Sequence, residues 1–340
     1  MKGRLENKIK TETAIKAKLN DAPDYMNRYF YYLQNKTHAT KKTYINNVIR
    51  FAKYIGNGEY PDIAAFEDVD AYRLQLFISE ISLIEKNGEM KETRGTSNCT
   101  VISSIKSFFD FLSMKRNGKA YISHNFFMEE KIDRPKIEEI PITYLTPDEV
   151  KLFEQKILEG AGNELSVAKQ SAWKYRDLLL FRIPVINGIR VTALSEISLK
   201  DIDFKRKKIK VTEKGNVNVE KDFDEKTEQY IKYWISQRKE LLGDTKCDYL
   251  FISNRKERMT TRAIEKVIKK YADECDFLHG KHITPHKLRS THGTNLYHAT
   301  GDLLLTSKSL NHKSTSPTRR YVAVFENEVA NAVNRVANMY

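Results

Sequence analysis

Cysteine, glycine and long apolar runs are all scarce in this chain of 340 residues. The three cysteines, Cys99, Cys247 and Cys275, are odd in number and far apart, which excludes a disulfide framework and fits a reducing compartment. The 14 glycines form neither a G-x-G-x-x-G nor a Walker A motif, which excludes those nucleotide-binding loops. No apolar run approaches the roughly 20 residues of a membrane span, and the first residues lack the apolar segment of a signal peptide. We therefore expect a cytoplasmic protein with no membrane partner.

Positive charge, in contrast, is in excess. Lysine and arginine number 58 against 45 aspartate and glutamate residues, for a formal net charge of +13. A hydrophobic content of 40% is enough for folded cores, so the chain is not a disordered basic tail. This balance indicates a folded protein with a polyanionic partner, nucleic acid before membrane. The length predicts about two domains.

The first part of the chain predicts a basic extension followed by a helical domain. Residues 1–20 carry six basic against two acidic residues without a strong apolar face, which predicts a solvated N-terminal extension. Residues 21–135 predict an all-α bundle, and residues 136–143, where periodicity fails beside Pro141, favour a linker. Apolar residues at helical spacing predict helices near 25–33, 40–56, 66–84 and 100–114.

Residues 144–340 predict a second domain that is rich in helix and contains a small β-sheet. Thr146, Pro147 and Glu149 form the pattern of a capping box with proline at the first helical position. Helices are predicted at 146–159, 167–183, 191–198 and 261–275. Short strands are predicted at 202–204, 208–212 and 249–252, with a Lys-Gly turn at 214–215.

Six residues of the second domain occur in an order that is informative about function. They are Arg190, Lys214, His286, Arg289, His312 and Tyr321. The intervals are 24 residues from Arg190 to Lys214, three from His286 to Arg289, 23 from Arg289 to His312, and nine to Tyr321. This ordered set resembles the tyrosine recombinase (phage integrase) family, whose compact Xer-type members show similar spacing. Each motif alone is weak, whereas the ordered set is specific.

These residue types suit phosphoryl transfer. A phosphodiester under attack gathers charge on its non-bridging oxygens, and two arginines can neutralise that charge with forked hydrogen bonds. A tyrosine hydroxyl has a free pKa of about 10, so as a nucleophile it needs a base or a cationic pocket. The leaving 5′-oxygen needs a proton, which a lysine at a hairpin tip can supply.

The resemblance implies a role for each residue. Tyr321 would attack the scissile phosphate and form a 3′-phosphotyrosine, while Arg190 and Arg289 hold the phosphate. His312 would donate a further hydrogen bond, Lys214 would protonate the leaving oxygen, and His286 would assist proton transfer. Neither a metal ion nor ATP is implied as a cofactor, because the phosphotyrosine conserves the bond energy.

The resemblance also implies an architecture and partners. A SAM-like core-binding bundle and a catalytic domain of the DNA breaking-rejoining type would close around double-stranded DNA at specific recombination sites. A homotetramer on two duplexes is implied, with a possible accessory directionality protein. A C-terminal helix at about 326–338 carries a narrow apolar stripe that would pack on its own subunit or on the next one. Thr40, Lys41, Lys42 and Thr43, at a predicted helix N-terminus, are expected to contact DNA.

Two positions depart from the family pattern. Family members usually carry Glu or Asp three residues after the first arginine, where this chain has Ala193. Glu196 lies six positions after Arg190 and would point elsewhere on a regular helix. Asn311 stands where a glycine commonly precedes the second histidine.

Several alternatives stay open at this level. Cys275, His279, His282 and His286 are spaced by four, three and four residues, which could form a zinc site on one helical face, although Pro285 and Gly280 oppose such a helix. A type IB topoisomerase-like nicking-closing enzyme would share the catalytic set, and a catalytically silent DNA-binding protein would share the scaffold. Integration and excision, transposition and chromosome-dimer resolution stay open as biological roles, and the short basic stretch ahead of the bundle favours a simple recombinase or one from a mobile element.

Overall fold

The computed structural model describes residues 2–86, 88–136, 141–213, 217–312, 314, 315, 318, 321 and 337. The chain divides into two compact units, Met1–Glu139 and Ile140–Tyr340. Within the described residues, no helix is both long and apolar enough to cross a membrane. The expected C-terminal helix at about 326–338 lies almost entirely outside the described residues.

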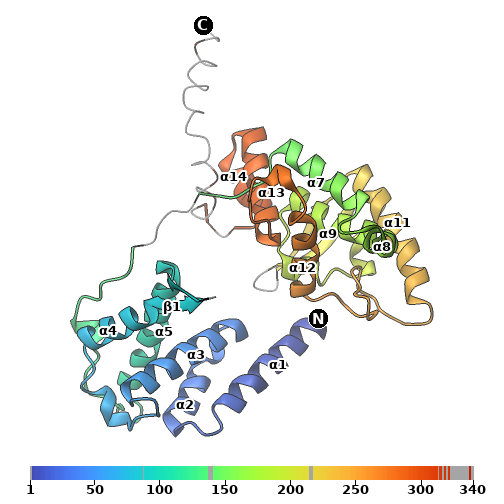
Figure 1. Cartoon of the computed structure of the whole chain (residues 1–340). Coiled ribbons are helices and arrows are strands. Elements are labelled where there is room, and N and C mark those ends of the chain that lie inside the picture. Colours follow the sequence, from blue (N-terminus) through green and yellow to red (C-terminus); the bar gives the residue numbers. More distant parts are fainter. Residues whose placement is uncertain are drawn as a thin grey trace. The chain divides into compact units, whose positions relative to one another are not determined.

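The first unit is built from helices (Figure 1). Its described elements are α1 (Lys2–Lys18), α2 (Asp24–Tyr32), η1 (Leu33–Asn35), α3 (His38–Ile55), η2 (Ile63–Phe66), α4 (Ala71–Ser82), β1 (Leu83–Lys86), β2 (Glu89–Glu92), α5 (Gly95–Ser113) and α6 (Phe126–Glu129). Thr37 begins α3 as its N-cap, because its side chain accepts a hydrogen bond from the backbone N–H of Thr40 at 3.2 Å.

Aromatic rings fill the core of this unit. α3 and α5 lie side by side, and both contribute phenylalanines to the buried cluster. Phe109 meets Phe126 edge to face at 4.8 Å between ring centroids, and Phe66 meets Phe108 at 5.2 Å in the same manner. Edge-to-face contacts place the positive ring edge against the negative ring face, so they add to the free energy gained by burial.

The N-terminal segment differs from the solvated extension that the sequence predicts. Residues Lys2–Lys18 form α1, which packs against α3. Ile15 and Leu19 are buried in the core of the unit. The prediction is therefore wrong for this segment, because two anchoring side chains are too few to produce a periodic pattern in the sequence.

The second unit combines helices with a small sheet. Its described elements are α7 (Pro147–Glu159), α8 (Glu164–Gln170), η3 (Ser171–Trp173), α9 (Lys174–Asn187), α10 (Val191–Leu194), η4 (Leu199–Asp201), β3 (Ile202–Asp203), β4 (Lys208–Glu213), β5 (Val217–Asp222), α11 (Glu225–Leu242), α12 (Thr261–Ala272), η5 (Asp276–Leu278), α13 (Pro285–Thr300) and α14 (Leu303–Ser309). The capping box predicted at Thr146 and Glu149 is present at the start of α7.

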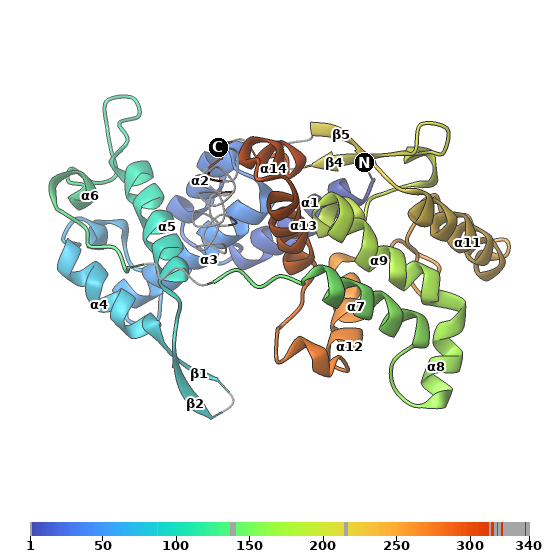
Figure 2. The ribbon, with the colours of Figure 1, turned by 90° about the horizontal axis from the view of Figure 1, so that it is seen from above.

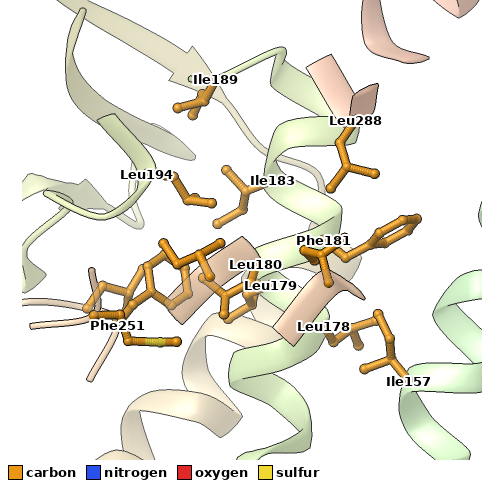
Figure 3. Packing of buried hydrophobic residues seen from close by; sticks show 14 of the residues in the cluster. Ile157, Leu178, Leu179, Leu180, Phe181, Ile183, Ile189, Leu194, Phe251 and Leu288 are labelled. Atoms are coloured by element: carbon orange, nitrogen blue, oxygen red, sulfur yellow. The ribbon is translucent and has the colours of Figure 1, made fainter. Parts of the chain in front are cut away.

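Helix α9 is the centre of the second unit. It contacts α7, α11, α12 and α13, and Figure 1 shows these helices around it. Figure 3 shows Leu178, Phe181 and Ile183 of α9 among Ile157 of α7 and Leu288 of α13, all in one buried cluster. Because α9 is apolar on most sides, it is surrounded by other elements, as a helix buried inside a domain must be.

The sheet of this unit is antiparallel, with the strand order β3-β4-β5. Figure 2 shows β4 beside β5. Its last pair joins Glu213 to Val217. Lys214, Gly215 and Asn216, which connect β4 to β5, lie outside the described residues, so the predicted turn is not described. The prediction of a mainly helical protein with a small β-sheet is confirmed.

Other predictions for this unit need correction. Residues 249–252 form no strand but isolated bridges, from Ser198 to Tyr249 and from Ile252 to Arg258. The helix predicted at 191–198 ends at Leu194 as α10. The sequence analysis does not predict α11, because charged residues occupy many of its positions and only a few apolar side chains face the core.

Candidate active site

Arg289 is buried in the first turns of α13. Its helix begins at Thr284, whose side chain caps the backbone N–H of Lys287, and Pro285 occupies the first helical position. The guanidinium donates hydrogen bonds to the backbone carbonyls of Gly188 and Leu310. Burial and, after it, the positive charge of Arg190 lower the pKa of Arg289 to about 10. The side chain is thus a fixed cation held by two separate segments.

Arg190 lies next to this arginine because of a glycine turn. Gly188 ends α9 in the left-handed conformation at φ 62°, and a Cβ there would lie 2.7 Å from the His292 ring. Two residues later Arg190 begins α10 as its N-cap. Its side chain is 32% exposed, so the guanidinium reaches the surface of the unit while it pairs with Glu213.

Glu213 joins the two arginines. It ends β4, and its side chain is only 1% exposed. Its carboxylate accepts a hydrogen bond from Arg190, and its Oε1 lies 3.8 Å from Nη1 of Arg289. The sequence analysis assigns no role to this residue. The only sequence feature that could have indicated Glu213 is the alanine at position 193, where an acidic residue is usual.

His312 lies beside the same cations. Asn311 places it by adopting φ 49°, a left-handed conformation that asparagine tolerates better than most residues and that glycine adopts freely. The Nδ1 atom of His312 is 2.8 Å from the hydroxyl of Thr318. Burial and the charges of Arg289 and Arg190 lower the pKa of His312 to about 4. The imidazole is therefore neutral near pH 7 and retains one N–H donor.

Tyr321 is buried against α13, with 6% of its surface exposed. A Cβ built on Gly293, one turn after Arg289, would lie 2.8 Å from Cζ of Tyr321. Glycine at this position therefore gives the tyrosine ring room against the helix that carries Arg289. The same helix therefore carries Arg289 and the glycine against which Tyr321 packs.

The comparisons agree with this constellation. The model of the phage integrase family matches residues 147–328, which is more than half of the chain and includes every residue of the site. The chain belongs to the phage integrase family. Its reaction class is that of the tyrosine recombinases, which cleave and rejoin DNA.

Named relatives of this recombinase are similar along most of their length. It is 26% identical over 286 residues to tyrosine recombinase XerS of Streptococcus gordonii, covering 79% of each chain. It is 27% identical over 327 residues to XerS of Streptococcus thermophilus, covering 88% of this chain and 90% of the relative. The solved post-cleavage complex of the XerH site-specific recombinase has 19% identity, a TM-score of 0.70, and coverage of 96% and 88%. That last likeness shows the shared fold.

Two further polar residues of the recombinase, Lys221 and His292, form hydrogen bonds near this site. Lys221 of β5 donates a hydrogen bond to the carbonyl of Ser309, and burial lowers its pKa to about 8. His292 of α13 lies between the Val185 carbonyl, at 3.2 Å, and the Ser309 hydroxyl, at 2.8 Å. Sequence reasoning missed both residues, since neither belongs to the ordered set.

The remaining predicted residues lie on the exposed side of α13, in the first unit or outside the described chain. His286 is exposed in the first turn of α13, three residues before Arg289. Lys214 lies outside the described residues, immediately after Glu213. In the first unit, Thr40, Lys42 and Thr43 are at least partly exposed near the N-terminus of α3, whereas Lys41 is buried against Glu12.

The zinc alternative rests on a helix that does not form. Between Cys275 and His286 the chain makes the short η5 helix, turns left-handed at His279, and begins α13 only at Pro285. The four candidate ligands therefore share no helical face. Among the described residues, no group of three or more metal-ligating side chains is assembled anywhere in the protein.

Proposed function

We propose that this recombinase breaks DNA by attack of the Tyr321 hydroxyl on a scissile phosphate. The bond from Tyr321 to phosphorus forms as the bond from phosphorus to the 5′-oxygen breaks. The products are a 3′-phosphotyrosine and a free 5′-hydroxyl, and attack by another strand's 5′-hydroxyl reverses the step and rejoins DNA. The observation that carries this proposal is the burial of the Tyr321 ring on α13, beside the helix turn that holds Arg289.

The two arginines supply the charge that the transition state needs. We infer that Arg190 and Arg289 bind the non-bridging oxygens, because both carry fixed guanidinium groups and Arg190 reaches the surface. His312, neutral near pH 7, donates one hydrogen bond to the same phosphate. Lys214 protonates the leaving oxygen and His286 assists proton transfer. These side chains need no metal or nucleotide cofactor for the charge balance.

The partner is double-stranded DNA with specific recombination sites. XerH was solved bound to its difH substrate, and lambda integrase was solved as a dimer on a core site. By analogy, the present chain binds paired sites as a homotetramer on two duplexes in the cytoplasm, where an accessory directionality protein can choose the outcome. Its role is the integration and excision of a mobile element or Xer-type resolution, and similarity to XerS over 88% of the chain supports the latter.

The test of this proposal is a single substitution at the nucleophile. Tyr321→Phe removes the hydroxyl but keeps the ring that packs on Gly293, so we expect the variant to bind target DNA normally. On a nicked suicide substrate it should form no covalent adduct in SDS gels. Tyr297→Phe, on the same helix as Gly293, is the matched control and should form the adduct at the normal rate. An SDS-stable adduct with Tyr321→Phe would assign the nucleophile to another tyrosine.

A further inference from the structure

Glu213 is the acidic side chain that the described part of the chain holds between the two arginines of the site. We propose that Glu213 is a positioning residue: its carboxylate orients Arg190 and Arg289 for the phosphate. It thereby supplies from strand β4 the negative charge that the family usually supplies three residues after the first arginine. This chain has Ala193 at that position. The inference rests on the proposed function, because it takes the arginines as the phosphate-binding groups.

The strand that carries Glu213 explains why this carboxylate is so deeply buried. Along β4, Ile209, Val211 and Glu213 alternate on the buried face, so the carboxylate ends an otherwise apolar row. A lone carboxylate in such a place would lose its hydration without compensation. The arrangement is therefore stable only because the arginines are paired with it, and pairing fixes the arginines in turn.

The geometry leaves Arg190 available to a ligand. The Glu213 side chain is 1% exposed and the Arg190 side chain 32% exposed, so the carboxylate lies on the inner side of Arg190. Its Oε2 accepts a hydrogen bond from Arg190, while Oε1 lacks a hydrogen-bond partner among the described residues. Arg289 is held from two further directions by the carbonyls of Gly188 and Leu310. A phosphate can thus approach from the open side without displacing Glu213.

The charge balance also suits a phosphate. The carboxylate of Glu213 pairs with Arg190 and lies 3.8 Å from Arg289, and the charges of all three groups act on the amine of Lys221. Glu213 therefore offsets one positive charge and leaves an excess for the anionic substrate, whose charge rises in the transition state. A neutral residue at 213 would leave three buried or half-buried cations repelling one another, and the guanidinium groups would separate.

Ala193 lies close to this arrangement. It is buried in α10, the helix that Arg190 caps, and α10 packs against β4. A carboxylate on α10 and one on β4 can therefore approach the same arginine from neighbouring elements. Because Ala193 has no carboxylate, Glu213 holds Arg190 instead.

The experiment compares three variants in single-turnover cleavage of the nicked suicide substrate, with DNA affinity measured in parallel. Glu213→Gln keeps the shape but removes the charge, so we expect cleavage to slow roughly 10- to 100-fold with little change in DNA affinity. Glu213→Asp keeps the charge and should retain more of the rate. Glu154→Gln is the matched control, because Glu154 is a buried carboxylate paired with Arg182 and Lys226 away from the site. It should lower thermal stability and leave cleavage unchanged.

A rescue experiment distinguishes a positioning role of Glu213 from an effect on stability alone. Adding Ala193→Asp to Glu213→Gln should restore part of the cleavage rate, whereas adding it to Glu154→Gln should change nothing. A Glu213→Gln variant that cleaves at the normal rate would overturn the inference, as would equal losses in Glu213→Asp and Glu213→Gln. A double variant that folds and binds DNA without any gain in rate would overturn the replacement of the usual acid. If the unsubstituted protein formed no adduct at all, the proposed function itself would fail instead.

Discussion

The two units of this recombinase bury different kinds of side chains. The first unit buries phenylalanine and tyrosine rings, and Lys41 is the one charged side chain that is buried among its described residues. The second unit buries a mainly aliphatic core. Its described part also buries six charged side chains, which are Glu154, Arg176, Asp177, Glu213, Arg238 and Arg289.

The two units therefore differ in how many buried charges each must stabilise. A buried charge costs free energy unless it is paired, so a domain that carries several needs a structural reason for each. In the second unit, Glu213 and Arg289 hold charges in the site where we propose that a phosphate reacts, and burial keeps water from weakening them. In the first unit, the lysines whose burial is described are at least partly exposed, with the exception of Lys41. The polar side chains buried among its described residues are Lys41, Asn98, Ser104 and Asn125.

The largest expected effect concerns the aromatic core. Phe109→Ala removes a fully buried ring that meets Phe126 at 4.8 Å, so the free energy of unfolding of the first unit should fall by about 3–5 kcal/mol. In hydrogen-exchange mass spectrometry, peptides of α3 and α5 should lose protection while those of α9 and α13 keep it. Tyr72→Ala, at a residue that is 69% exposed, is the control and should change stability by less than about 0.5 kcal/mol. Equal loss of protection in α9 would mean that the two units unfold as one.

The next effect is the response of the second unit to acid. Burial lowers the pKa of His292 to about 4 from the ordinary 6.5, so the unfolded chain binds a proton there more readily than the folded one. The contribution of His292 to the free energy of unfolding is therefore largely present above pH 6.5. It falls as the pH drops toward 4, by about 3 kcal/mol at that pH. The first unit buries no histidine among its described residues, so acid should destabilise it less.

Urea unfolding at pH 7 and pH 4.5, followed by hydrogen exchange in each unit, measures this contrast. His292→Gln should reduce the pH dependence of the second unit, since an amide does not titrate. An unchanged slope in that variant would show that other buried groups carry the acid response.

The smallest effect separates two adjacent lysines of α3. Lys42 is exposed, so Lys42→Ala should weaken DNA binding and flatten the slope of log K against log salt by about one unit. Lys41 lies 3.2 Å from Glu12 and 5.2 Å from the Phe30 ring centroid, so Lys41→Ala should leave the slope nearly unchanged. Both lysines are predicted from the sequence to contact DNA. Equal slopes for both variants and the unsubstituted protein would mean that this end of α3 does not touch phosphate.

Local patterns predicted helices where a single face is apolar. For α3, the predicted range 40–56 compares with His38–Ile55 in the structure, because Val48, Phe51 and Ile55 repeat at helical spacing. The run predicted as helix at 66–84 breaks instead at Ser82, where the chain enters the β1-β2 hairpin. Leu83 continues the apolar run in the sequence, but its side chain is exposed in a strand. Hydrophobicity alone does not reveal which elements a residue will meet.

The sequence by itself determined which residues can carry the reaction. The order of Arg190, Arg289, His312 and Tyr321 is readable because phosphoryl transfer demands those chemical groups. Only the tertiary structure decided that Glu213 pairs with Arg190, that Lys41 turns inward, and that burial lowers the pKa of His292. Each of these outcomes depends on partners distant in sequence and on the loss of water around them. Pairing and desolvation are properties of the assembled core, so no local pattern of residues encodes them.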